Sequence, residues 1–211
     1  MFLFFQVWSY KLKSLFFGFA IFCGAITSTV SGAVTTYSNL SVWTEDVVAG
    51  GSIVASENFN SYNGFYPSAI TGSTGGITWT ANASGGLYCD SGIFSTNDMN
   101  VAATFTFAPG VQAVGGNIFG TSVDFSSIAN AKIKVTLADG SAYIGYSSGP
   151  ADFVGFISNG AAISSMTILA TKPSVDVYVA ADNLFFGVTA IPAPGAAALL
   201  GLAALVSRRR R

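Results

Sequence analysis

The stretch AKIKVTLADGSAYIGY, residues 131–146, carries the clearest structural signal in the chain. Apolar and polar residues alternate over residues 131–137, which is the two-residue period of a strand with one buried face. Asp139-Gly140 follows, a pair that favours a type I′ turn in which both central residues have positive φ. Residues 141–146 then provide a returning strand. This stretch therefore predicts an antiparallel β-hairpin.

Similar strand-like segments recur over the rest of residues 34–190. One helix is predicted over Asn39–Val48. In it, Leu40, Trp43 and Val47 follow an i, i+3, i+7 spacing that can bury one face. The other predicted strands are 52–59, 76–80, 101–107, 153–158, 163–170, 175–179 and 183–188. Strands in this number and spacing indicate an all-β fold: an antiparallel β-sandwich of jelly-roll type with one short N-terminal helix.

Charge is distributed unevenly along the 211 residues, although the formal net charge is only −1. All ten acidic residues lie between Glu45 and Asp182, whereas six of the nine basic residues lie near the two ends. The middle of the chain has three lysines and no arginine, and so carries a charge of −7. This excludes the basic face that nucleic-acid binding requires. The absence of histidine excludes histidine bases and histidine-ligated metal sites.

Residues 1–33 predict a secretory signal peptide. Lys11 and Lys13 provide a positive n-region, and residues 15–26 form an apolar, helical h-region. Small residues then lead to Ala33, the predicted cleavage site. The apolar run is shorter than the roughly 20 residues of a membrane-spanning helix, although an uncleaved anchor is the alternative.

Residues 191–211 contain three features in sequence. Pro192 and Pro194 interrupt regular structure, and a short apolar segment of small residues with helical character follows. The chain ends on four arginines: Arg208, Arg209, Arg210 and Arg211. Since arginines stay on the cytoplasmic side of a membrane, this order predicts a segment that holds an exported protein transiently in the inner membrane. An ordinary short C-terminal anchor is the alternative.

This order of proline motif, small-residue helix and arginine cluster resembles the PEP-CTERM sorting signal of Gram-negative bacteria. Ala193 stands where that family has its glutamate, so the motif is a proline-alanine-proline variant. The resemblance implies export, followed by removal of the tail by an exosortase, a membrane enzyme similar to cysteine proteases. It also implies delivery to the cell surface or the extracellular space, often alongside exopolysaccharide production. It implies no activity for residues 34–190.

Residues 34–190 also resemble the small β-sandwich proteins that commonly carry such a tail. The matching segments, in the expected order, are the helix with Trp43, then 57–59, 115–121, 137–141, 153–158 and 182–187. This resemblance implies a β-sandwich and leaves its function open. The chain is thus divided into a signal peptide (1–33), a β-sandwich domain (34–190) and a sorting signal (191–211).

Glu57 and Asp182 are the candidate metal ligands. Glu57 lies near the first predicted strand and Asp182 precedes the last, and the terminal strands of jelly rolls often pair. Carboxylates are hard oxygen ligands that suit a structural calcium ion. The alternative is an edge-strand acid and an Asp-Asn turn without any metal. No other cofactor is expected.

Aromatic side chains are the candidate sugar-binding groups. Tyr62, Phe65 and Tyr66 are preferred because they lie in a predicted loop, whereas Trp79 at mid-strand is expected in the core. The other aromatic residues considered are Tyr88, Tyr143 and Tyr146. Cys89 is the only cysteine left after signal removal and has no cationic neighbour in sequence, so a buried, inert thiol is predicted. An intermolecular disulfide is the alternative.

Three functions follow from these patterns. The leading interpretation is an exported, non-enzymatic cell-surface or extracellular-matrix protein associated with exopolysaccharide. The alternative is a carbohydrate-binding module that recognises an extracellular glycan. The third is a hydrolase based on paired carboxylates, which is not favoured because ten acids bring some pair together by chance.

Overall fold

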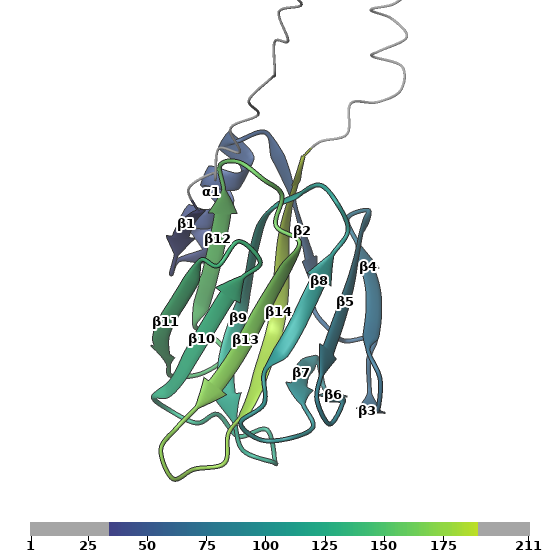
Figure 1. Cartoon of the computed structure of the whole chain (residues 1–211), viewed down its shortest axis with the longest axis vertical. Helices are drawn as coiled ribbons and strands as arrows, with labels where there is room; N and C mark the ends of the chain where they lie inside the picture. The colour runs from purple at the N-terminus through teal and green to yellow at the C-terminus, as the bar shows by residue number, and fades with distance from the viewer. Residues whose placement is uncertain (1–33, 190–211) are drawn as a thin grey trace, which may run out of the picture. The chain divides into compact units, whose positions relative to one another are not determined.

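The computed structural model describes residues 34–189, which form a sandwich of two antiparallel β-sheets (Figure 1). In chain order the elements are β1 (Val34–Tyr37), α1 (Leu40–Ala49), β2 (Ser52–Glu57), β3 (Gly64–Tyr66), β4 (Ile70–Thr74), β5 (Ile77–Ala83), β6 (Leu87–Asp90), β7 (Ile93–Thr96), β8 (Ala103–Phe107), β9 (Val111–Thr121), β10 (Ala131–Leu137), β11 (Ala142–Ser147), β12 (Phe153–Ser158), β13 (Ser165–Thr171) and β14 (Tyr178–Thr189). Sheet A has the order β1-β12-β9-β14-β7-β6-β3, with β2 paired to β14. Sheet B has the order β11-β10-β13-β8-β5-β4.

This architecture confirms the predicted all-β, antiparallel sandwich with one short N-terminal helix. The apolar segments predicted at the two ends of the chain, including Ala33 and the sorting-signal residues, lie outside the described residues. Within residues 34–189, no helix has the length and apolar character needed to cross a membrane.

The hairpin of residues 131–146 forms as predicted, but its turn is of a different type. Strands β10 and β11 pair in antiparallel register, with Thr136 opposite Ala142. Gly140 has a φ of 89°, whereas Asp139 does not have positive φ, so the type I′ prediction is wrong. The Leu137 N–H donates to the Ser141 carbonyl over 2.8 Å, which encloses a three-residue loop. Such a loop needs only one residue with positive φ, and glycine supplies it.

The helix begins one residue later than predicted because Asn39 caps it. The Asn39 side-chain oxygen accepts hydrogen bonds from the backbone N–H groups of Ser41 (2.9 Å) and Val42 (3.2 Å). These N–H groups have no partner within the helix, which is why asparagine is favoured at this position. Trp43 and Val47 are buried, as their spacing predicts.

Two predicted strands, 175–179 and 183–188, are replaced by the single strand β14. Its pairing register with β9 shifts between Ala181 and Leu184, so Asp182-Asn183 forms a bulge and not a turn. β9, which has 11 residues and lies between β12 and β14, was not predicted as a strand. It contains Gly115, Gly116 and Gly120, and glycine is depleted in strands.

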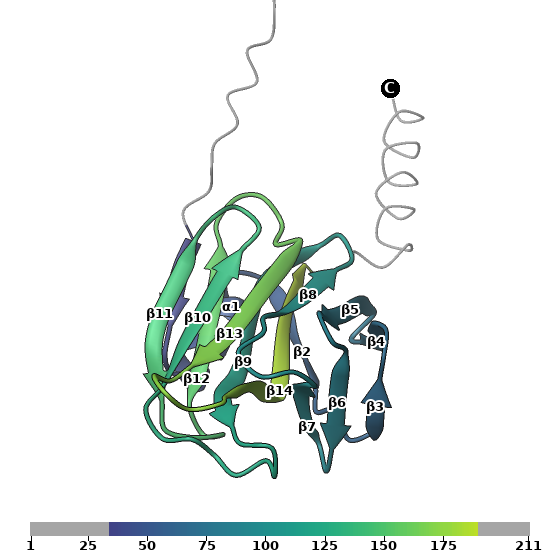
Figure 2. The same ribbon diagram turned by 60° about the horizontal axis from the view of Figure 1, so that its bottom comes forward.

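The sandwich buries two hydrophobic clusters. The larger one lies between the sheets, and its largest side chains include Trp79, Phe59, Phe94, Phe105 and Phe186. The smaller one lies on the outer face of sheet A, where α1 packs against it (Figure 2), and comprises Trp43, Val47, Ala113 and Phe153. The outer face of sheet A is therefore covered at the α1 end.

Candidate functional site

The two candidate metal ligands lie on paired strands. β2 and β14 are antiparallel neighbours with Leu184 opposite Glu57, so the segments that carry Glu57 and Asp182 do meet. One oxygen of Glu57 accepts a hydrogen bond from the Phe59 N–H over 2.9 Å, and Asp182 is half-buried in the β14 bulge. Within residues 34–189, no three His, Cys, Asp or Glu side chains are grouped to hold a metal ion. Calcium binding stays a prediction.

The preferred aromatic residues come together, but not as an exposed platform. Gly64–Tyr66 is strand β3, so the loop prediction is wrong for Phe65 and Tyr66. The Tyr62 ring packs 5.7 Å from the Trp79 ring and 6.4 Å from the Tyr66 ring. Burial, and secondarily the Glu57 carboxylate, raise the pKa of Tyr62. Phe65 alone among the three has an exposed side chain, at 52%.

The remaining aromatic candidates are distributed over different parts of the fold. Trp79 is fully buried, which confirms the core prediction. Tyr146, on the edge strand β11, is 71% exposed, and Tyr143 on the same strand is half-buried. Tyr88 is exposed on β6, where it forms part of a pocket.

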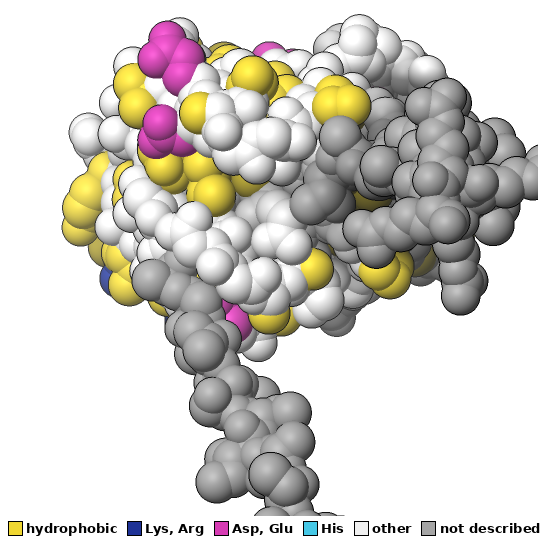
Figure 3. Space-filling view, turned by 90° about the horizontal axis from the view of Figure 1, so that it is seen from above, with side chains coloured by type: hydrophobic (Ala, Val, Ile, Leu, Met, Phe, Trp, Pro, Cys, Tyr) yellow, Lys and Arg dark blue, Asp and Glu magenta, His cyan; other side chains and the backbone are white. Residues whose placement is uncertain are grey.

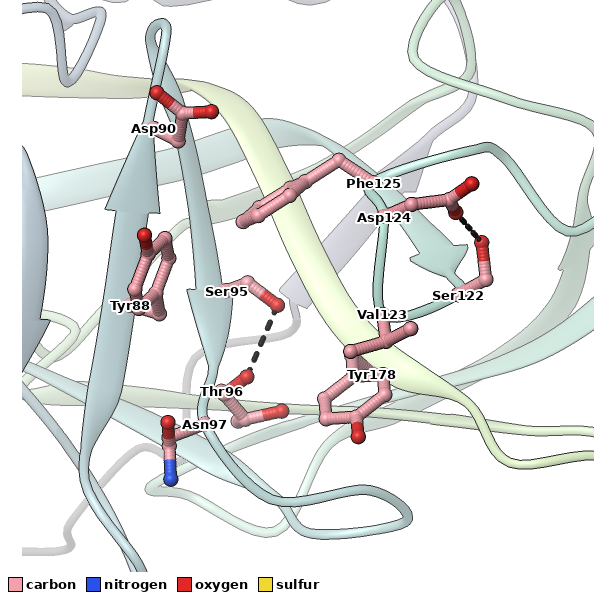
Figure 4. Close-up of a pocket in the computed structure, with 10 residues that line it drawn as sticks. All are labelled: Tyr88, Asp90, Ser95, Thr96, Asn97, Ser122, Val123, Asp124, Phe125 and Tyr178. Carbon is pink, nitrogen blue, oxygen red and sulfur yellow. Dashed lines mark hydrogen bonds between the residues drawn. The ribbon is translucent and has the colours of Figure 1, made fainter.

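This pocket, which we call the β6–β7 pocket, has a volume of about 420 Å³ (Figure 4). It lies on the outer face of sheet A, at the end that α1 does not cover. Its lining residues are Tyr88, Asp90, Ser95, Thr96, Asn97, Ser122, Val123, Asp124, Phe125 and Tyr178. They come from β6, β7, the start of β14 and the loop between β9 and β10. Four separate segments thus build one open site.

Buried hydroxyl groups belong to the pocket lining. Ser95 is buried, and its hydroxyl donates to the Thr96 carbonyl oxygen over 3.1 Å. Thr96 is 1% exposed, and its own hydroxyl has no hydrogen-bond partner in the described structure. An unpaired buried hydroxyl is costly. Thr96 lies opposite the core residue Leu87 in the β6–β7 register, so its hydroxyl faces the interior of the sandwich and is not accessible from the pocket.

The loop after β9 holds Phe125 beside Tyr88. The Ser122 N–H donates to the Ser126 carbonyl (3.0 Å), and the Phe125 N–H donates to the Ser122 carbonyl (3.1 Å). Phe125 has a φ of 62°, which is unfavourable for a bulky residue. Its ring lies 5.8 Å from the Tyr88 ring, with an interplanar angle of 42°. The loop thus keeps an aromatic ring at the pocket in a conformation that it would otherwise avoid.

Asp124 organises the same loop. One of its carboxylate oxygens accepts hydrogen bonds from the Ser122 hydroxyl (2.5 Å) and the Ser126 N–H (3.2 Å). These bonds lower the pKa of Asp124, and the bond from Ser122 has the largest effect. The carboxylate is therefore ionised at neutral pH. Asp90 is the second acidic residue of the pocket, and no lysine or arginine of residues 34–189 lines it.

Acidic side chains also appear elsewhere on the surface. At the α1 end of the sandwich they are visible at several places, whereas Lys or Arg is visible only at one edge (Figure 3). This agrees with the charge of −7 carried by the middle of the chain. Negative charge in the described part of the chain is therefore not confined to the pocket.

Cys89 points away from the pocket into the core. It follows Tyr88 on β6, so the two side chains project from opposite faces of the strand. Its side chain is completely buried, and burial raises the pKa of the thiol to about 12. The predicted buried thiol is confirmed.

Sequence reasoning identified only one member of this pocket, Tyr88. The sequence did not identify four other members: Phe125, Tyr178, Asp90 and Asp124. The positions of aromatic and acidic residues along the chain do not show which distant segments meet in the fold. One signal was present: the run Ser122-Val123-Asp124-Phe125-Ser126 combines turn-forming residues with an aromatic side chain.

Comparison with known proteins adds little to this geometry. No family model and no curated protein matches the chain. The chain is similar to the solved structure of a family two carbohydrate esterase from Cellvibrio japonicus, with 12% sequence identity and a TM-score of 0.41. The match covers 68% of this chain and 36% of that chain. A likeness of this degree carries no argument about function, which we infer from the site alone.

Proposed function

We propose that the chain is an exported, non-enzymatic protein of the cell surface or extracellular matrix, and that its β-sandwich binds a polysaccharide in the β6–β7 pocket. One observation carries the proposal: three aromatic rings surround an open pocket that also presents an exposed amide side chain. The rings belong to Tyr88, Phe125 and Tyr178, and the amide to Asn97.

The dimensions and chemistry of the pocket suit a sugar. Its volume of about 420 Å³ lies within the range of small-molecule sites. Figure 4 shows Tyr88 and Tyr178 on opposite sides of Ser95 and Thr96. Aromatic rings offer apolar surface to the C–H face of a sugar, while hydroxyl and amide groups bind its hydroxyls. The exposed Asn97 and the phenolic hydroxyl of Tyr178 provide such groups here.

A binding assay tests this proposal. The full-length chain, purified in a detergent that contains no sugar, is titrated with a panel of neutral and charged oligosaccharides by calorimetry. We expect saturable binding to at least one of them, weakened about tenfold or more by Tyr178→Ala. Tyr146→Ala, which removes an exposed tyrosine from β11, is the matched control and should bind as the wild type does.

Two results would contradict glycan binding in this pocket. The first is the absence of saturable binding to every oligosaccharide in the panel. The second is binding that Tyr178→Ala and Tyr146→Ala leave equally unchanged, since the ligand would then occupy a different surface.

Export and sorting form the second half of the proposal, and they rest on the resemblance of residues 1–33 and 191–211 to transport signals. We propose transient anchoring in the inner membrane of a Gram-negative-type bacterium, then cleavage by an exosortase-type enzyme and release to the surface. Intact-mass measurement of the mature protein should show loss of residues 1–33 and of the terminal arginines. Retention of Arg208–Arg211 in the extracellular form would contradict this half.

A carboxylate-based hydrolase is the second candidate, because Asp90 and Asp124 line the same pocket. In such an enzyme one carboxyl group must be protonated to act as the general acid. The lowered pKa of Asp124 makes it unsuited to that role. Release of reducing ends from a bound oligosaccharide, abolished by Asp90→Asn, would establish a hydrolase in place of a binding protein.

A further inference from the structure

The β6–β7 pocket has negative charge and no positive charge of its own. Asp90 and Asp124 line it, and none of the three lysines in residues 34–189, Lys132, Lys134 and Lys172, does so. A uronic acid would bring a third carboxylate into this environment without a counter-charge, which is unfavourable. The pocket therefore selects against anionic sugars.

The two carboxylates differ in what they can offer a ligand. One oxygen of Asp124 accepts hydrogen bonds from Ser122 and Ser126 of its own loop, whereas Asp90 accepts one, from the Ser91 hydroxyl over 3.2 Å. Asp90 is two residues from Tyr88 on β6, and both side chains are exposed on the same face of the strand. Figure 4 shows the Asp90 carboxylate and the Tyr88 and Phe125 rings around the same end of the pocket. Asp90 is therefore the carboxylate placed to meet a ligand.

A carboxylate beside aromatic rings is suited to an ammonium group. The carboxylate forms a charge-assisted hydrogen bond, and the face of an aromatic ring attracts a cation within about 6 Å of its centroid. The Tyr88 and Phe125 rings lie 5.8 Å apart and are tilted by 42°, so they are not stacked on each other. Because Asp90 and Tyr88 project from the same face of β6, one cation can approach the Asp90 carboxylate and an aromatic face together.

The other end of the pocket is suited to the hydroxyl groups of a ligand. Asn97 is exposed there, and the half-buried Tyr178 has a phenolic hydroxyl, so both can form hydrogen bonds with a sugar. A ligand that satisfies both ends carries hydroxyls and one positive charge. We propose that the pocket binds a de-N-acetylated amino sugar within a polysaccharide, with its ammonium group at Asp90 and Tyr88 and a ring hydroxyl at Asn97. This inference rests on the proposed function and names the class of sugar that the site selects.

Calorimetry on the full-length chain with three oligosaccharides of equal length tests the inference. The probes are oligomers of glucosamine, N-acetylglucosamine and galacturonic acid. We expect glucosamine to bind about tenfold more tightly than its acetylated form, which has lost the charge, and galacturonate to bind least. Asp90→Asn should abolish the preference for glucosamine. Asp139→Asn, the same charge change in the β10–β11 turn, should preserve it.

The outcomes separate this inference from the proposed function. Equal affinity for the glucosamine and N-acetylglucosamine oligomers, or a preference that survives Asp90→Asn, would overturn the amino-sugar assignment and leave glycan binding intact. Preferred binding of galacturonate would overturn it as well. Absence of binding by all three oligomers, and by the wider panel, would overturn glycan binding itself. The near-ultraviolet circular dichroism of each variant verifies that it is folded.

Discussion

The outer face of sheet A has two ends that use the same kind of aromatic contact in different ways. At the α1 end the Trp43 and Phe153 rings lie 5.8 Å apart, and at the pocket end the Tyr88 and Phe125 rings lie at the same distance. Trp43 is completely buried, and its indole N–H donates to the Phe156 carbonyl over 3.3 Å. The rings at the pocket end keep exposed surface. One pair therefore stabilises the fold, while the other is available to a ligand.

The difference between the two ends arises from the strand residues beneath them. A Cβ atom on Gly155 would lie 2.6 Å from Trp43 Cδ1, and one on Gly187 would lie 2.8 Å from Val47 Cγ1. Glycine at these positions lets α1 approach the sheet closely. At the pocket end, Ser95 and Tyr178 occupy the outward positions, and a short loop takes the place of a helix. Small residues thus close one end of the sheet, and polar and aromatic residues line the open one.

The largest expected effect is on stability at the α1 end. Trp43→Ala should lower the free energy of unfolding by about 3–5 kcal/mol, because it leaves a cavity and removes the indole hydrogen bond to the Phe156 carbonyl. Urea denaturation measures this. Val42→Ala is the matched control, since Val42 is on the same helix but 47% exposed, and it should cost less than about 1 kcal/mol. Similar losses of unfolding free energy in both variants would show that the packing of Trp43 against sheet A does not stabilise this end.

The next effect concerns the pocket end, where we expect binding and stability to separate. Phe125→Ala should weaken oligosaccharide binding about tenfold while changing the free energy of unfolding by only about 1 kcal/mol. Phe125→Gly should be at least as stable as Phe125→Ala, because glycine adopts the observed φ of 62° without strain. Calorimetry and urea denaturation measure the two quantities. A stability loss as large as that of Trp43→Ala would mean that both ends are structural.

The α1 end was predictable from the sequence because its signals are local. The spacing of Trp43 and Val47 identified the buried face of the helix. The apolar run over residues 153–158 predicted the bounds of β12 as observed, and the alternation over residues 131–137 did the same for β10 in sheet B. Local periodicity suffices where an element buries one continuous face. The pairing of the segments that carry Glu57 and Asp182 was also anticipated, because it follows from their positions in a jelly-roll order.

The pocket end was not predictable because it depends on tertiary contacts. β9, which leads into the pocket loop, was missed because Gly115 and Gly116 weaken a strand signal. At the α1 end of this strand, a Cβ atom on Gly115 would lie 2.6 Å from the Phe153 ring. The glycine is there because of a neighbour about 40 residues away in the chain. The left-handed conformation of Phe125 runs against its own preference and is imposed by the loop hydrogen bonds. Tyr62 and Tyr66, the preferred sugar ligands, instead pack against the core.

The smallest effect concerns the loop that carries Phe125. The pKa of Asp124 is lower in the folded protein than its ordinary value of 3.8, because its carboxylate accepts hydrogen bonds from Ser122 and Ser126. A lowered pKa means that the ionised carboxylate stabilises the folded state. This contribution is present above the ordinary pKa and is lost as the pH falls through the folded pKa. Because the carboxylate is exposed, the contribution is small.

Urea denaturation between pH 3 and pH 7 reveals this contribution through a difference between variants. We expect Asp124→Asn to lower stability slightly at neutral pH, and the gap from the wild type should narrow as the pH falls through the region of the Asp124 pKa. Ser122→Ala, which keeps the carboxylate and removes its first hydrogen-bond donor, should reproduce part of the same change. A gap that stays constant with pH in both variants would show that the Asp124 carboxylate does not hold the loop. The difference between the two ends of sheet A would then depend on backbone hydrogen bonds alone.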